Sequence, residues 1–365
     1  MPLNASGPIS LAGSTAGQSI SNEFRSLTTS TASLSQYYRG GTYVGPHNSP
    51  VATSGAISLG SFYNAQKRYP VTITISSNTT NYNLQTSSVS GYSASWTDVT
   101  LTINAGVTVS GTSSNGALMV SSGFNSADTI HINNSGTIQG GGGAGGAAAN
   151  GNGGLDGINL NPASSANIRI TNNSGGVIGG GGGGGGSGMA VVSYATDAYG
   201  TNLGTVYQRG GGGGGGAGSP GGSAGGTAGT GSGNYYNYSV TAGSGGAGSS
   251  TSGGAGGAGE DGYTVYISAY YRSYAGVGGA GGARGASGSS GGVGGMTAPG
   301  YTPYTQSPTT SYTAVPFLPP YSMMAMQSGH PARTGGPAGN AIKGTAKYST
   351  PIVNNGTIYG PQVSS

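Results

Sequence analysis

Residues Ile168–Gly186 read IRITNNSGGVIGGGGGGGG, in which a short strand pattern leads through an Asn/Gly turn into eight consecutive glycines. Thr129–Gly143 and Ile352–Gly360 repeat the order of strand, Asn-Asn turn and second short strand. Asn and Gly supply the positive φ angles that tight turns require. Three copies of one unit predict a repetitive, layered architecture in place of a globular core.

Alternating apolar and polar residues precede these units. Val71–Ile75 reads VTITI, Val99–Ile103 reads VTLTI and Val107–Val109 reads VTV. This period of two is typical of half-buried strands. We therefore expect residues 70–139 to form a β-strand-rich region and residues 341–365 to close the protein with a last strand unit.

Residues 140–340 alternate glycine tracts with inserts of richer composition, and the whole chain has 81 glycines among 365 residues. A polyproline-II-like glycine helix has no internal hydrogen bonds, so its N–H and C=O groups can bond to neighbouring tracts. Each such bond contributes about 1 kcal/mol, whereas ordering a residue costs about 1–2 kcal/mol. The sequence therefore predicts many tracts packed together as polyglycine-II helices that carry surface loops. A flexible glycine linker is the alternative.

Residues 1–69 have a more conventional composition. Gly7–Leu11 (GPISL) returns as Gly55–Leu59 (GAISL), and Ile20, Phe24 and Leu27 have the spacing of an apolar helix face. We expect a small compact N-terminal module whose role is separate from that of the glycine region. The expected fold class is thus mainly β and polyglycine-II, with little α-helix.

Composition excludes several classes of function. Only 5% of residues are charged, and the 11 basic residues form no run that could neutralise successive phosphates, which argues against nucleic-acid binding. The absence of cysteine excludes disulfides and thiolate metal sites. The amino terminus has no secretory signal pattern, and no apolar stretch approaches the ~18 residues of a membrane span. We expect a soluble protein.

The sequence offers little for catalysis. The seven carboxylates are far apart along the chain, and Glu260-Asp261 is the one adjacent pair. Glycosidase chemistry needs two carboxyl groups about 5–10 Å apart, which distant residues can reach only through the fold. His47, His131 and His330 show no metal-ligand spacing. We expect no enzymatic activity, no cofactor and no metal.

The order of strand-rich segment, Asn-Asn-Ser-Gly-Thr-Ile unit, glycine tract and aromatic insert resembles the distal long-tail-fibre adhesins of T-even-like phages and other glycine-rich phage tail proteins. The match rests on Ile73–Leu84, on the repeated units and on Gly339–Gly344 followed by Val353–Ile358, and it covers roughly residues 70–365. The resemblance implies a polyglycine sandwich at the tip of a virion tail fibre. Its loops would contact a bacterial surface receptor, and residues 1–69 would attach to a phage tail or tail-fibre protein.

Tyrosine dominates the inserts, which hold fifteen of the 24 tyrosines. A tyrosine offers a rigid apolar face and one hydroxyl at a low cost in side-chain entropy, which suits binding loops. The alternative is that these rings cover the edges of the glycine bundle. The expected receptor-binding residues are Tyr194, Tyr199, Tyr207, Tyr235, Tyr236, Tyr238, Tyr263, Tyr266, Tyr270, Tyr271, Tyr274, Tyr301, Tyr304, Tyr312, Phe317 and Tyr321.

The hypothesis is therefore a fibre-tip adhesin that recognises an outer-membrane protein or a glycan and binds through several fibres per particle. A purely structural tail protein is one rival hypothesis. A second is a depolymerase with a carboxylate cleft on a long β-helix, and a third is an ice-binding protein. The sequence leaves the choice between a monomer and a homo-oligomer open.

Overall fold

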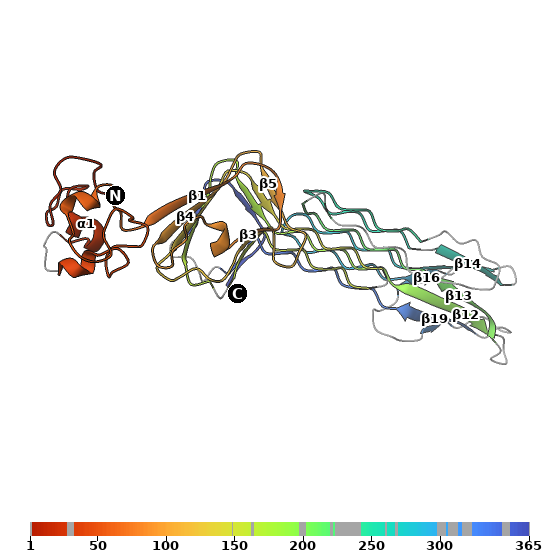
Figure 1. Cartoon of the computed structure of the whole chain (residues 1–365). Coiled ribbons are helices and arrows are strands. Elements are labelled where there is room, and N and C mark those ends of the chain that lie inside the picture. The colour runs from red at the N-terminus through yellow and green to blue at the C-terminus, as the bar shows by residue number, and fades with distance from the viewer. Residues whose placement is uncertain are drawn as a thin grey trace.

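The computed structural model describes residues 2–27, 33–147, 149–161, 164–196, 202–219, 222, 242–259, 261–266, 269–297, 304–305, 313–315, 323–344 and 351–364. The molecule is elongated (Figure 1). An N-terminal module, a coil of short strands and a bundle of extended tracts follow one another along its length, and further strands lie at the far end. Within the described residues α1 (Ile20–Arg25) is the single α-helix. The prediction of a mainly β protein with little α-helix is confirmed.

The N-terminal module has a small core of its own. The helix α1 is capped by Ser19, whose side chain accepts a hydrogen bond from the backbone of Asn22, and it ends at Ser26, which has a φ of 55°. Leu27 follows this turn and is 42% exposed, so its expected place on a buried helix face is wrong. Two 3-10 helices complete the module, η1 (Leu34–Tyr37) and η2 (Leu59–Phe62). The buried residues are Leu3, Ile20, Phe24, Tyr37, Val44, Val51, Phe62 and Ala65.

The repeated Gly-x-Ile-Ser-Leu segments are held in equivalent ways. The Tyr63 hydroxyl donates to the carbonyl of Gly7 at 2.5 Å, and the Tyr38 hydroxyl donates to that of Gly55 at 2.5 Å. Both glycines have positive φ angles, which a side chain would disfavour. The echo in the sequence therefore corresponds to two similar local structures on one module.

The next part is a three-sided parallel β-helix of five turns, made of three five-stranded sheets. Each turn contributes one strand to each sheet. The first turn contains β1 (Tyr69–Ile75), β2 (Thr79–Thr80) and β3 (Tyr82–Leu84), followed by the 3-10 helix η3 (Thr86–Ser88). The second contains β4 (Thr97–Ile103), β5 (Thr108–Ser110) and β6 (Leu118–Val120), and the third contains β7 (Thr129–Asn134), β8 (Thr137–Gln139) and β9 (Ile158–Leu160). The fourth contains β10 (Asn167–Asn172), β11 (Val177–Gly179) and β20 (Ile342–Lys343), and the fifth contains β21 (Val353–Asn354), β22 (Thr357–Tyr359) and β23 (Gln362–Val363).

Parallel register stacks the apolar residues of successive turns into columns. Leu101 pairs with Ile132, which pairs with Ile170, and all three are fully buried. Val99, Ile130 and Ile168 form the neighbouring column. The three repeated units are thus the third, fourth and fifth turns of one coil, which explains their shared pattern.

The asparagines of the repeated units form a ladder at the corner between the first two sheets. Asn134 Nδ2 donates to Asn172 Oδ1 at 2.8 Å, and Asn172 Nδ2 donates to Asn354 Oδ1 at 2.9 Å. Asn134 and Asn172 are fully buried. Stacked amides satisfy one another without water, so a polar residue can occupy an interior corner.

The glycine region is inserted into this coil at one corner. The chain leaves after β8 and returns to β9 through residues 140–157, and it leaves again after β11 and returns to β20 through residues 180–341. The tracts of both insertions run parallel or antiparallel to one another, away from the β-helix and back to it (Figure 1). Nine described tracts build the resulting bundle, here called the glycine block: residues 140–147, 149–157, 180–188, 210–219, 242–249, 252–259, 275–283, 286–294 and 331–341.

Two antiparallel sheets lie at the far end of the glycine block (Figure 1). One has the order β13-β12-β19-β18, from Asn202–Gln208, Ala190–Thr196, Met323–His330 and Thr313–Val315. The other has the order β14-β15-β16-β17, from Asp261–Tyr266, Ala269–Tyr274, Gly295–Thr297 and Tyr304–Thr305. The sheets adjoin each other, since β12 contacts β15 and β13 contacts β14. Among the described residues, no helix is both long and apolar enough to span a bilayer.

Candidate functional site

The glycine block is held together by backbone hydrogen bonds that run in three directions. With three residues per turn, every third N–H of a polyglycine-II helix points to the same neighbour. In the tract 180–188, Gly181, Gly184 and Ser187 donate to one returning tract, residues 149–157. Gly182, Gly185 and Gly188 donate to residues 210–219, and Gly183, Gly186 and Met189 donate to residues 286–294.

The same central tract accepts hydrogen bonds from three further neighbours. Gly140, Gly143 and Gly146 donate to it from one side, Gly276, Gly279 and Gly282 from a second, and Arg333, Gly336 and Gly339 from a third. Six tracts therefore surround residues 180–188, which are completely buried. The packed polyglycine-II helices predicted from the sequence are present.

Side chains are excluded from most enclosed positions of the glycine block, where only small ones such as those of Ser187 and Ala217 are buried. A Cβ on Gly184 would overlap the carbonyl oxygen of Ala144, and one on Gly186 would overlap that of Arg333. At the periphery every third position is open to solvent, and it carries the side chains of Val277, Ala280 and Ala283. Unbroken glycine runs thus occur where tracts are enclosed, and Gly-Gly-x repeats occur where one side faces water.

Two short turns of the glycine block lie at its β-helix end, opposite the inserts that have described strands. A tight turn at Ser249–Ser252 lies beside the β-helix, where the side chain of Gln139 donates to the carbonyl of Ser250 at 2.7 Å. Arg284, in another near-end turn, donates to the same carbonyl at 2.8 Å. The inserts with described strands all emerge at the other end. These contacts anchor the turns next to the β-helix. The tracts that leave these turns therefore reach the other end at fixed positions, where the inserts begin.

The structure brings part of the predicted receptor-binding set together on the two far-end sheets, as strands and not as loops. The backbones of Tyr194, Tyr207, Tyr263, Tyr266, Tyr270, Tyr271, Tyr274 and Tyr304 lie on β12, β13, β14, β15 and β17. The other predicted positions lie outside the described residues: Tyr199, Tyr235, Tyr236, Tyr238, Tyr301, Tyr312, Phe317 and Tyr321.

Arg272 also lies among these positions and was not predicted from the sequence. Arg272 on β15 is the register partner of Tyr263 on β14, and it sits between Tyr271 and Tyr274 in the chain. The run YYRSY contained the signal, because arginine combined with tyrosine is typical of contact surfaces. Arg272 therefore joins the candidate positions.

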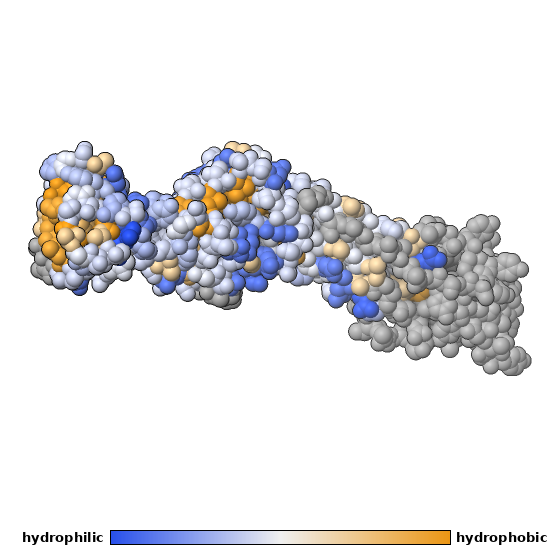
Figure 2. Space-filling view, viewed as in Figure 1, coloured by the Kyte–Doolittle hydropathy of each residue, from blue (hydrophilic) through white to orange (hydrophobic). Residues whose placement is uncertain are grey.

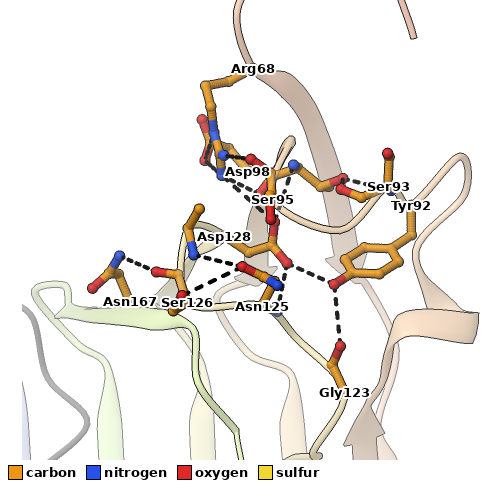
Figure 3. A network of polar contacts seen from close by, with 12 residues as sticks. Arg68, Tyr92, Ser93, Ser95, Asp98, Gly123, Asn125, Ser126, Asp128 and Asn167 are labelled. Atoms are coloured by element: carbon orange, nitrogen blue, oxygen red, sulfur yellow. Dashed lines mark hydrogen bonds and ion pairs between the residues drawn. The ribbon is translucent and has the colours of Figure 1, made fainter. Parts of the chain in front are cut away.

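A second polar site lies where the N-terminal module meets the β-helix (Figure 3). The Arg68 guanidinium lies 2.7 Å from Asp98 Oδ1 and 3.8 Å from Asp128 Oδ1. Asp128 is fully buried and accepts hydrogen bonds from the Tyr92 hydroxyl at 2.7 Å and from the backbones of Asn125 and Thr97. Burial, that hydrogen bond and the charge of Asp128 raise the pKa of Tyr92 to about 12.

This network brings together two carboxylates that are far apart in the sequence. Asp98 and Asp128 converge on one arginine. A buried carboxylate with three donors and a facing guanidinium is suited to fixing an edge of the β-helix, not to transferring protons. Within the described residues, no three metal-binding side chains cluster. His131 binds Thr171 Oγ1 at 2.9 Å and contacts Arg169.

Comparison with known proteins gives two matches. Residues 70–363 match the family model described as phage tail fibre adhesin Gp38. The chain also matches the crystal structure of the gp37-gp38 adhesin tip complex of the bacteriophage S16 long tail fibre at 19% identity, with a TM-score of 0.38. That match covers 85% of this chain and 88% of the other. No curated protein matches, and residues 1–69 lie outside the family model.

Proposed function

Since the chain belongs to the Gp38 family of phage tail fibre adhesins, we propose that it contacts the host receptor through the two antiparallel sheets at the far end of the glycine block. Its place on the virion is the tail fibre, and its role is host recognition. The contact residues would be the tyrosines predicted from the sequence together with Arg272. Rigid aromatic side chains lose little entropy on binding, which suits them to this task.

The observation that carries the proposal is the position of the tyrosine-bearing strands. They lie at the end of the molecule that is farthest from the N-terminal module (Figure 1). The tract 180–188 leads directly into β12 at Ala190, and the tract 252–259 is followed by β14 at Asp261. A scaffold fixed by backbone bonds in three directions holds such strands in place before binding, which lowers the entropy lost on contact.

The second element of the proposal is that the N-terminal module attaches the adhesin to a tail or tail-fibre protein. The module has its own core and lies outside the region that the family model matches. It also exposes Leu27, Leu34 and Leu59 by 42%, 53% and 45%. Figure 2 shows apolar surface on this module, at the end of the molecule opposite the far-end sheets. Exposed apolar groups of this kind favour a protein interface.

The third element is that the protein binds its receptor without cleaving it. The supporting observation is that Asp98 and Asp128, which come together in the fold, are both engaged by Arg68. Release of reducing sugar from host polysaccharide by the purified protein would contradict this element and favour the depolymerase alternative.

Replacement of Tyr270, Tyr271 and Tyr274 by alanine tests the receptor surface. We expect adsorption to host cells to fall by at least about tenfold, because interface aromatics carry a large share of binding energy. Thermal unfolding and the oligomeric state should stay unchanged. The matched control is Tyr359→Ala on β22, which removes a 41% exposed tyrosine from the β-helix and should leave adsorption unaffected. Full adsorption by the triple variant would contradict the proposal.

A pull-down from host envelope identifies the class of receptor. Loss of capture after protease treatment of the envelope indicates an outer-membrane protein, and unchanged capture indicates a glycan. If the triple tyrosine variant still captures the receptor, the receptor contact lies elsewhere on the protein.

A further inference from the structure

A pocket of about 440 Å³ lies at the joint between the N-terminal module and the β-helix. One wall comes from α1 and the residue after it, through Asn22, Glu23 and Ser26, and another comes from the linking segment 66–70. Asp98 of β4 closes the side nearest the β-helix. Figure 2 shows hydrophilic surface at this narrow joint. Ser26 is exposed and Gln66 and Lys67 are partly exposed, so a ligand can enter the pocket without disturbing the core.

The wall formed by segment 66–70 is firmly fixed. The Gln66 backbone N–H donates to Asn48 Oδ1 at 2.9 Å, and its carbonyl accepts from Asn48 Nδ2 at 3.0 Å. The Lys67 N–H donates to Glu23 Oε1 at 2.8 Å. The ring of Tyr69 lies 5.5 Å from that of His47 between centroids. These contacts give the pocket a defined shape in the unliganded protein, which favours binding.

The charged groups of the pocket differ in what they contact. Arg68 donates to Asp98 Oδ1 and to the carbonyls of Thr97 and Ser95, which engages four of its five N–H groups. Glu23 accepts from the Lys67 backbone. The Lys67 ammonium, by contrast, has no ion-pair or hydrogen-bond partner among the residues that the structure describes. The same holds for the Gln66 carboxamide, which leaves two kinds of donor available in one pocket.

The net charge of the N-terminal module also favours an acidic ligand. Residues 1–69 contain four basic residues, Arg25, Arg39, Lys67 and Arg68, and one acidic residue, Glu23. A basic module favours an acidic partner and increases its rate of association. A carboxylate can form an ion pair with an ammonium and accept a hydrogen bond from an amide at the same time. The lining carboxylates of Glu23 and Asp98 already accept from the Lys67 N–H and from Arg68, so the donors that remain available in the pocket fit a carboxylate ligand.

We propose that this pocket receives a carboxylate side chain from an acidic segment of the tail-fibre protein that carries the adhesin. The inference rests on the proposed attachment through the N-terminal module and names the chemistry of that contact. Lys67 Nζ pairs with the carboxylate, and the Gln66 carboxamide donates a second bond. Most of the lining residues come from α1 and the segment before β1, at the end of the molecule opposite β12 and β14 in Figure 1, which favours a ligand from the fibre over an acidic sugar of the host surface.

The test uses the full-length protein and, as the probe, purified tail fibres from phage grown without this adhesin. Lys67→Gln removes the charge and keeps the backbone N–H that binds Glu23. We expect about tenfold weaker binding to fibres for Lys67→Gln and a larger loss for Lys67→Glu. The matched control for Lys67→Glu is Lys343→Glu on β20, which makes the same change in net charge and should bind fibres within about twofold of the wild type.

Salt dependence gives a second readout. Between about 0.05 and about 0.5 M salt, wild-type binding should weaken steeply, and Lys67→Gln should respond less because its ion pair is already lost. Fibre binding by Lys67→Glu that equals the wild type overturns the inference and leaves the attachment proposal standing. Wild-type protein that fails to bind fibres overturns both. Loss of binding to host envelope, with fibre binding intact, would assign the pocket to an acidic sugar and also overturn the inference.

Discussion

The β-helix and the glycine block satisfy the same backbone groups in two opposite ways. In the β-helix, hydrogen bonds run along three flat sheets, and large side chains such as Leu101, Ile132 and Ile170 fill the interior. In the glycine block, hydrogen bonds run from each tract toward several neighbours, and the backbone itself fills the interior. One part therefore requires large side chains at its centre, and the other admits only small ones such as those of Ser187 and Ala217.

This difference makes the glycine block dependent on the β-helix. A glycine tract gains about 1 kcal/mol per hydrogen bond, while ordering each residue costs about 1–2 kcal/mol, so no tract is stable alone. The tracts that begin at Gly140 and Gly180 are rooted in β8 and β11, whose register is set by stacked isoleucines. We infer that the β-helix aligns the first tracts and that later tracts join an existing bundle.

The largest effect is expected from Gly184→Val in the central tract. Its Cβ would overlap the carbonyl oxygen of Ala144, and six surrounding tracts prevent the chain from moving aside. We expect the free energy of unfolding of the glycine block to fall by more than about 4 kcal/mol, which exceeds the usual cost of an overpacked core residue. Limited proteolysis should then cut the glycine tracts, and adsorption should be lost, while the β-helix still unfolds cooperatively.

Ala280→Val is the matched control for this variant. Position 280 is exposed on a peripheral tract, and the same tract already carries an exposed valine at position 277. Stability should stay within about 0.5 kcal/mol of the wild type. Equal damage from both substitutions would show that the block does not distinguish its centre from its surface.

A smaller effect is expected from Ile132→Ala in the β-helix. This residue is fully buried between Leu101 and Ile170, and its truncation should lower the free energy of unfolding by about 2–4 kcal/mol in denaturant titrations. Because the tracts are rooted in the β-helix, the glycine block should lose protection together with it. Thr102→Ala, on an outward position of β4, should change stability by less than about 0.5 kcal/mol. A glycine block that stays protected after the β-helix of Ile132→Ala has unfolded would contradict the dependence.

The smallest effect is expected from mild acidification. Burial, together with the positive charge of Arg169, lowers the pKa of His131 below its usual value. The neutral ring therefore contributes stability that is present above pH about 6.5 and is lost as the pH falls through the lowered pKa. No histidine lies in a glycine tract, so the stability of the glycine block itself should not change over this pH range. Thermal unfolding at pH 7.5 and 5.0 should show a smaller shift in His131→Gln than in the wild type, and equal shifts would rule out this contribution.

The sequence predicted local patterns well and long-range pairing poorly. Alternation at Val99–Ile103 and the repeated Asn-Asn units indicated strands and layers, because side-chain period and turn chemistry are local properties. Register in a parallel coil joins residues one full turn apart, and β11 and β20 of one turn are separated by the whole larger insertion. For the same reason, the meeting of Asp98 and Asp128 at Arg68 left no sequence signal.

The candidate site shows a similar division. Glycine runs and tyrosine-rich inserts are visible in composition, and the need for bare backbone at Gly184 follows from packing alone. The sequence could not predict which tracts are neighbours, because tracts without side chains contain no residues that specify their register. Only the folded chain places β12 and β14 at one end of the molecule.

Amide hydrogen exchange in the tract 180–188 tests the central claim most directly. Each of these N–H groups lies in a buried tract and donates to a backbone carbonyl of a neighbouring segment, so we expect exchange as slow as in the buried strands of the β-helix and much slower than in free glycine peptides. Exchange at the rate of an unstructured peptide throughout this tract would contradict a rigid glycine block and remove the support for the receptor-binding strands.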